Sequence, residues 1–281
     1  TQDENSLGYP ICINSKIYFV HLQGGIVCIL KDNQIVRIDN SFNHKMQINS
    51  FIFQHKNKLY KYGGYGFWSE RNFFTEFNLD NLEWDIVDFS KSKEVPIGSH
   101  NSKIIINEND FYVYGGETLK ENNPLEGIIN KEIWKFNIKM KLWEKLGETK
   151  MDFNKFDSFV VYNDKHIYID IKKDLMYEVD VLKNNIKKYK LTSINKQLSS
   201  INDIFFIDGL FYSFKWKPNT SNSEVQIITS TKNNFFGEFI SEEPLYYTTT
   251  TIYDFIKLIV ILSILILIVV LYIFLHKRFS N

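Results

Sequence analysis

The chain between residues 10 and 240 consists of short hydrophobic runs separated by polar turns, without a long amphipathic helical pattern. Ile, Val, Phe and Tyr dominate the runs, while Asn, Asp, Lys and Gly occupy the turns, as at 31–34, 107–110 and 162–165. Short β-branched and aromatic runs bounded by turn residues are typical of strands. The pattern therefore predicts an all-β domain over residues 10–245.

One strand motif recurs five times, with its first tyrosine at Tyr18, Tyr60, Tyr112, Tyr168 and Tyr212. The spacings are 42, 52, 56 and 44 residues. A short strand and a tight turn precede each motif, and two more strands follow it, so each unit is a four-stranded meander. Such sheets pack radially into β-propellers of roughly four to eight blades. We expect about five blades. A sixth, degenerate blade and a stack of sheets that does not close are alternatives, and residues 1–9 are a candidate closing strand.

Two units carry a more specific signature, formed by Tyr62-Gly63-Gly64 with Trp84 and by Tyr114-Gly115-Gly116 with Trp134 and Trp143. A double glycine after a hydrophobic strand, followed by an aromatic residue, a short loop and a tryptophan, resembles the kelch repeat. Kelch proteins build one propeller blade per repeat. The first unit has a displaced pair, Gly24-Gly25, and the last two units lack the pair. The resemblance implies that the glycines are structural, and we expect the three tryptophans to pack between blades.

The end of the chain has a different pattern. Residues 258–275 contain no charge, and Ser263 is their one small polar residue. A bilayer core of about 30 Å needs roughly 20 such residues in a helix, and a buried core helix is rarely this long and apolar on every face. We expect residues 254–275 to cross the lipid bilayer as a single helix, with 246–253 as a short stalk.

The flanking charges predict an orientation. Lys277 and Arg278 follow the apolar stretch, whereas Glu242 and Glu243 precede it. By the positive-inside rule the tail 276–281 is cytoplasmic, and the propeller lies in the periplasm or at the cell exterior. Export implies a signal peptide that has been removed. At the other end, a tail-anchored ectodomain and a cytoplasmic domain following Asn281 are both compatible with the sequence.

Composition argues against nucleic acid as a partner, disorder for most of the chain, and a disulfide. The 33 Lys and Arg residues balance 33 Asp and Glu residues, which argues against nucleic acid as a partner of residues 1–281. Hydrophobic residues make up 44% of the chain, enough to exclude disorder for most of it. Cys12 and Cys28 fall on the first and third strands of one unit, about 9–10 Å apart, which is too far for a disulfide. We expect two unpaired thiols in the core.

Motifs of catalysis are not found in the sequence. The six histidines form no HxH, HExxH or zinc-like spacing, and GxSxG and P-loop motifs are absent. Carboxylates are numerous but not paired in a recognisable acid–base pattern. We therefore expect no metal, no cofactor and no catalytic residue, and hence no enzyme.

Binding is the function that the loops favour. The turn after the second strand of the second unit contains four candidate binding residues: Tyr65, Phe67, Trp68 and Arg71. Aromatic anchors with an arginine are typical of protein-binding hot spots, and they also suit stacking on a sugar. In the alternative, Phe67 and Trp68 fold back to cap the blade.

Two other loops are weaker candidates. Residues 117–131 are polar, and we expect them to form a flexible insertion. Trp216, between two lysines, is a third candidate in the fifth unit.

These observations predict a non-catalytic propeller outside the cell membrane, which binds a small ligand or a protein partner with its loops. A sensor or receptor ectodomain on a single-pass anchor is the leading hypothesis. A scaffold subunit of a larger membrane complex is the second, and a propeller enzyme acting on carbohydrate is the third.

Overall fold

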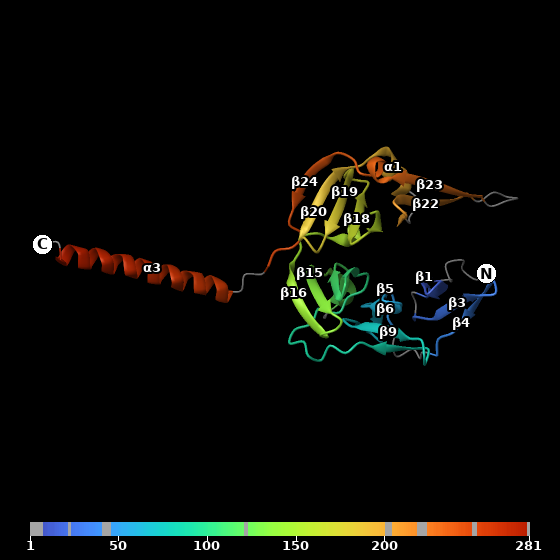
Figure 1. Cartoon of the computed structure of the whole chain (residues 1–281), viewed down its shortest axis with the longest axis horizontal. Helices are drawn as coiled ribbons and strands as arrows, with labels where there is room; N and C mark the ends of the chain where they lie inside the picture. Colours follow the sequence, from blue (N-terminus) through green and yellow to red (C-terminus); the bar gives the residue numbers. More distant parts are fainter. Residues whose placement is uncertain are drawn as a thin grey trace. The chain divides into compact units, whose positions relative to one another are not determined.

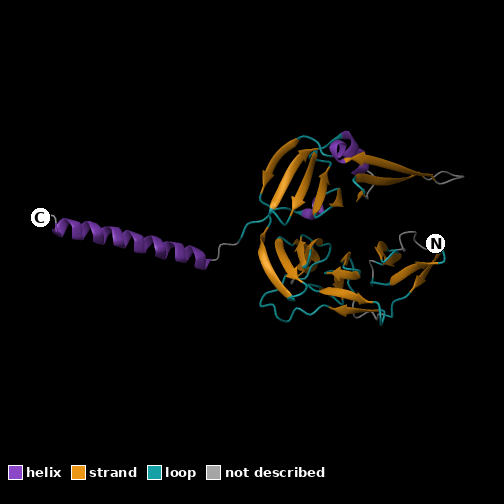
Figure 2. Cartoon of the chain, viewed as in Figure 1, coloured by secondary structure: helices purple, strands orange, loops and turns teal. Residues whose placement is uncertain are grey.

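The computed structural model describes residues 8–21, 24–40, 46–120, 123–199, 204–217, 224–248 and 252–279. The chain divides into two compact units, Thr1–Tyr247 and Thr248–Asn281. Strands dominate the first unit and a single helix the second (Figure 2).

The first sheet is a four-stranded antiparallel meander of β1 (Tyr9–Ile13), β2 (Lys16–Val20), β3 (Val27–Lys31) and β4 (Gln34–Arg37). Its tight turns place Asn14, Ser15, Asp32 and Asn33 at positive φ, the geometry of hairpin turns whose twist matches the strands. Of the candidate closing segment 1–9, residues 1–7 lie outside the described residues, and Tyr9 begins β1.

The two cysteines lie on β1 and β3 of this sheet, as predicted, with β2 between them. Both are free thiols. The prediction that both belong to the core is wrong, because Cys12 is exposed and Cys28 is half-buried. Cys12 lies next to Ile11 and Ile13, which take the buried face, and alternation along the strand turns Cys12 outward.

The second and third sheets have the same plan. Their strands are β5 (Phe51–His55), β6 (Lys58–Tyr62), β9 (Phe74–Asn78) and β10 (Glu83–Ile86), and then β11 (Lys103–Asn107), β12 (Asp110–Tyr114), β15 (Glu132–Asn137) and β16 (Leu142–Glu148). In both, the chain between the second and third strands makes a separate two-stranded hairpin: β7 (Tyr65–Gly66) with β8 (Ser69–Glu70), and β13 (Glu117–Lys120) with β14 (Asn123–Ile129).

The last two sheets do not have four strands: the fourth has five and the fifth has three among the described residues. The fourth contains β17 (Ser158–Tyr162), β18 (Lys165–Asp170), β19 (Leu175–Asp180), β20 (Asn185–Lys190) and β24 (Phe239–Glu243), and the fifth contains β21 (Ile204–Ile207), β22 (Leu210–Lys217) and β23 (Glu224–Thr231). The prediction that each unit is a four-stranded meander is therefore wrong for the fifth unit, whose described sheet has three strands. The chain turns through α2 (Lys232–Phe235) and pairs with β20 instead, so β24 lies beside β20 (Figure 1).

The cause of this departure is a buried aromatic pair. Phe235 is fully buried and stacks on Phe211, with the ring centroids 3.7 Å apart. Helix α1 (Ser193–Ser199) contributes Leu198 to the same cluster. Residue 235 therefore belongs to the packing between the fourth and fifth sheets and not to an outer strand.

The sheets pack face to face along the chain, each against the next. Buried clusters join the first and second, second and third, third and fourth, and fourth and fifth sheets. Between the second and third, Phe53 lies edge-on to Phe111 at 5.2 Å, and Phe74 stacks on Phe136 at 5.0 Å. This arrangement is a β-propeller of five blades, numbered here in chain order, and the aromatic content of the chain lies largely between its blades.

The second unit contains helix α3 (Ile252–Phe279), of which the structure describes the side chains of residues 256–270. Within the described part of the chain, no helix is both long enough and apolar enough to cross a membrane.

Candidate functional site

The hairpin β7–β8 of blade 2 carries the aromatic residues predicted to bind. Phe67 and Trp68 form its tip, with φ of 50° and 67°. Bulky side chains rarely adopt this left-handed region. Phe67 is 52% exposed and Trp68 is 91% exposed. The ring of Trp68 therefore projects into solvent and does not fold back onto the blade.

The base of the same hairpin is held tightly. Tyr65 exchanges two backbone hydrogen bonds of 2.8 Å with Ile48. A Cβ added to Gly66 would lie 2.3 Å from the carbonyl oxygen of Met46, so a glycine is needed for this close approach. The hairpin thus presents a pair of exposed rings on a base that is fixed by backbone contacts.

An ion pair joins this hairpin to blade 3. Glu70 on β8 lies next to His100, with Oε1 to Nδ1 at 2.8 Å, and the Glu70 side chain is only 6% exposed. His100 Nε2 lies 3.9 Å from Glu117 Oε2 on β13. The hydrogen bond to Glu70 raises the pKa of His100 above its usual value; burial opposes this, and the charges of Glu70 and Glu117 reinforce it. The cluster therefore favours a protonated His100 between two carboxylates.

The two double glycines occupy equivalent positions, directly after β6 and β12. Gly63 and Gly64 have φ of 66° and 90°, and Gly115 and Gly116 have 66° and 86°. A Cβ on Gly63 would lie 2.5 Å from the carbonyl oxygen of Ser99, in the segment that leads to the next blade. Glycine is required there by both the backbone conformation and the lack of space.

The three repeat tryptophans are buried between blades, as predicted. Trp84 is completely buried, and its Nε1 donates a 2.7 Å hydrogen bond to the carbonyl oxygen of Gly25 in blade 1. Trp134 and Trp143 lie in the core shared by blades 2 and 3, and Trp143 stacks on Phe74 of blade 2 at 5.5 Å.

The remaining predicted binding residues do not gather at the tip. Tyr65 is half-buried at the hairpin base. Arg71 is also half-buried, and its guanidinium lies 5.8 Å from the ring centroid of Phe73. Trp216 lies on β22, and its side chain falls outside the part of the chain whose side chains the structure describes. Phe67 and Trp68 are therefore the pair that the structure brings together as an exposed surface.

The second loop, 117–131, forms strands in its described part, where an irregular insertion was expected. Its described residues form the hairpin β13–β14, with Glu117 paired to Ile129 and Thr118 to Ile128. It follows β12 as β7–β8 follows β6, so the two hairpins are the same elaboration in consecutive blades.

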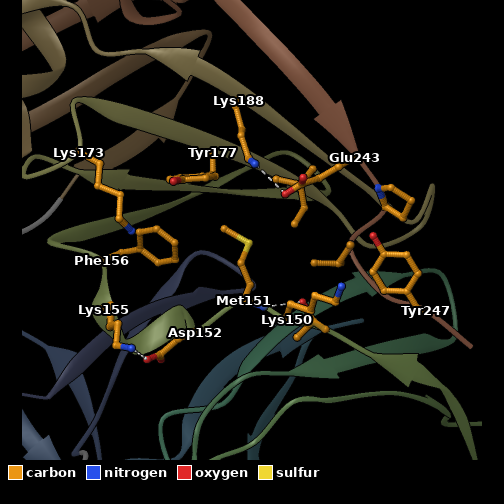
Figure 3. Close-up of a pocket in the computed structure, with 14 residues that line it drawn as sticks. Lys150, Met151, Asp152, Lys155, Phe156, Lys173, Tyr177, Lys188, Glu243 and Tyr247 are labelled. Carbon is orange, nitrogen blue, oxygen red and sulfur yellow. Dashed lines mark hydrogen bonds and ion pairs between the residues drawn. The ribbon is translucent and has the colours of Figure 1, made fainter. Parts of the chain in front are cut away.

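A cavity of about 430 Å³ lies between blades 3 and 4 (Figure 3). Lysines surround it, but carboxylates already hold three of them. Lys188 pairs with Glu243 at 2.8 Å, Lys155 with Asp152 at 2.9 Å and Lys173 with Asp170 at 2.9 Å. The ammonium of Lys150 lies 5.2 Å from the ring centroid of Tyr247. The positive charge of the lysines around this cavity is therefore largely neutralised by carboxylates of the protein itself.

No sequence pattern predicted the Glu70–His100–Glu117 cluster. Its members come from three segments of the chain, and no spacing rule connects them. The one available signal was that each follows the second strand of a blade or precedes the first, where propeller loops converge. Among the described residues, no group of three or more His, Cys, Asp or Glu side chains is arranged to hold a metal ion.

Comparisons with known proteins address the fold. No protein-family model matches the chain, and no curated protein matches it. Among solved structures, the one titled "Structure of YjhT" is similar with a TM-score of 0.56 and 16% sequence identity, and the match covers 85% of this chain and 86% of that chain. At this identity the similarity concerns the propeller fold.

Proposed function

We propose that the chain is a membrane-anchored binding protein: a kelch-like propeller, displayed outside the cell membrane, that docks a protein partner through the Phe67–Trp68 tip and does not catalyse a reaction. The observation that carries the proposal is the tip itself, two aromatic side chains held in solvent on a strained turn. The kelch assignment is part of the proposal and is supported by the two glycine pairs at positive φ.

The tip costs the fold stability, and the Trp68 side chain, which is 91% exposed, gives little packing in return. A left-handed backbone costs a non-glycine residue roughly 1–2 kcal/mol, and exposed aromatic surface forgoes the gain from burial. Strain of this kind is found at functional sites, where the surrounding structure imposes it. The bonds between Tyr65 and Ile48 and the Glu70–His100 pair impose it here.

A protein partner fits this geometry. Tryptophan is enriched among interface hot spots, where it fills a concave pocket on the other molecule. A tip that is fixed at its base loses little conformational entropy when it is buried, so more of the contact energy appears as affinity. The projecting Trp68 is therefore suited to insertion into an apolar pocket of another protein.

The proposed anchor is supported by the second unit. Every described side chain of α3 over residues 256–270 is exposed, and all but Lys257 and Ser263 are apolar. An uncovered apolar stretch of this kind suits a lipid environment.

Photocrosslinking with the full chain in intact cells tests the docking proposal. A benzophenone amino acid replaces Trp68 in one variant and Ile207 in a control; Ile207 is 53% exposed beside the β21–β22 turn. We expect a discrete protein adduct from position 68 that weakens when Phe67→Asn is added, and no such adduct from position 207. Equal labelling from the two positions, or adducts with lipid alone, would contradict the proposal.

A further inference from the structure

A second cavity, of about 380 Å³, lies between blades 3 and 4. Strand β11 of blade 3 contributes Lys103, and blade 4 contributes Ser158, Phe159 and Tyr168. The segment joining the two blades adds Phe153 and Phe156. A volume of this size is within the range of small-ligand sites.

Lys103 is the charged group of this cavity that the protein does not neutralise. Its ammonium lies 4.8 Å from the ring centroid of Phe159, and among the described residues no carboxylate forms an ion pair with it. Burial lowers its pKa below the usual value, and no neighbouring charge opposes the shift. The lysines of the 430 Å³ cavity differ, because three of them are paired with acidic residues.

The carboxylate that lines the cavity is committed elsewhere. Glu117 Oε1 accepts a 2.9 Å hydrogen bond from Asn154 Nδ2, and its Oε2 lies 3.9 Å from His100 Nε2. Glu117 therefore faces the His100 cluster.

Aromatic side chains form much of the remaining lining, together with Asn101 and Asn154. The rings of Phe153, Phe156 and Phe159 surround Tyr168, with centroid distances of 5.1, 5.0 and 5.6 Å. Ser158, which is 7% exposed, has a buried hydroxyl without a hydrogen-bond partner among the described residues. The cavity thus combines one cation with a ring-lined wall.

We propose that this cavity binds a small organic carboxylate, whose anionic group pairs with Lys103 and whose ring or apolar body lies against the phenylalanines. One lysine matches one negative charge, and the described lining holds no second lysine or arginine to balance a dianion such as a phosphate monoester. The site is separate from the docking tip and goes beyond the proposed function, because the propeller would respond to a metabolite as well as to a partner.

Fluorine NMR titration of the full chain in lipid nanodiscs tests this proposal with 4-fluorobenzoate as the probe. The neutral isostere 4-fluorobenzamide reports the contribution of charge. We expect the carboxylate to bind at least ten-fold more tightly than the amide at pH 7, because only the carboxylate pairs with Lys103. Equal affinities for the two probes would overturn the proposal.

Variants test whether the preference for the carboxylate probe arises in this cavity. Lys103→Met should abolish the preference for the carboxylate, and Lys103→Arg, which keeps the charge, should retain it. Lys232→Met is the matched control, since Lys232 also lies over an aromatic ring, that of Tyr162 at 5.6 Å, but on the surface. Loss of the preference in the control, or its persistence in Lys103→Met, would place binding outside this cavity.

Discussion

His166 on β18 shows how the propeller interior sets the chemistry of a single side chain. Its Nδ1 lies 2.5 Å from the hydroxyl of Tyr114, which also lies 3.0 Å from the hydroxyl of Tyr168. Burial, together with the positive charge of Lys103, lowers the pKa of His166 to about 3. The imidazole is therefore neutral at any physiological pH, and the fold excludes its charged form.

The propeller should consequently lose stability in mild acid. A histidine whose pKa is lower in the folded than in the unfolded chain contributes stability above its unfolded value, near 6.5, and that contribution is lost as pH falls toward 3. Linkage gives a loss of about 2 kcal/mol between pH 7 and pH 5 from this residue. Urea unfolding followed by tryptophan fluorescence at several pH values measures it.

The variant His166→Phe isolates the contribution. The phenyl ring can fill the site beside Phe159, and Tyr114 keeps Tyr168 as a partner. We expect the variant to lose less stability than the unaltered chain over the same pH range. His100 acts in the opposite direction, because its raised pKa adds stability as pH falls, and it is present in both proteins. An unchanged pH slope in His166→Phe would show that His166 is not the group responsible.

At the scale of elements, β7–β8 is a hairpin with unsuitable turn residues. Two-residue turns with both central residues at positive φ strongly favour Asn-Gly. The chain follows this rule in part elsewhere, with Asp32-Asn33 and Asp208-Gly209 at such turns. Phe67 and Trp68 violate it, and this local exception is a reason to connect the hairpin with function.

Replacing the tip by the favoured turn should therefore stabilise the protein. In Phe67→Asn/Trp68→Gly the backbone geometry is retained without strain, and we expect a gain of about 1–2 kcal/mol in the free energy of unfolding. Urea unfolding compares the double variant with the unaltered chain. The control Asp208→Ala, at a turn whose residue already suits positive φ, should be destabilising. A double variant less stable than the unaltered chain would mean that the aromatic rings support the fold.

Sequence patterns predicted the strands well because each blade is local, with neighbouring strands joined by short turns. They did not predict that β24 joins blade 4, since a strand pattern specifies a face and not a partner. The aromatic residues of the tip were visible in the sequence, but their exposure was not. The Lys103 cavity could not be foreseen, because Lys103 begins an ordinary strand and its aromatic neighbours are contributed by the following segment and blade.

At the scale of the whole molecule, the end of the propeller chain is fastened to two blades. After β24 has paired with β20 of blade 4, Tyr247 exchanges two 3.0 Å backbone hydrogen bonds with Glu148 of blade 3. Asn184 adds bonds of 2.8 and 3.0 Å to the backbone of Tyr246. A force applied through α3 would thus be distributed over two blades, which suits a domain held by its C-terminal side.

The proposed anchor can be tested by membrane extraction. The full chain should stay with the membrane fraction during alkaline carbonate extraction, whereas a variant ending at residue 248 should be released. Leu265→Arg/Ile268→Arg is the matched control of full length. Each arginine near the centre of a membrane helix costs about 2.5–3.5 kcal/mol of insertion free energy, so carbonate should release this variant as well. Protease added to intact cells should then remove the propeller and spare a tag placed after Asn281. Release of the full chain by carbonate would contradict the anchor. A protected propeller would contradict only its orientation.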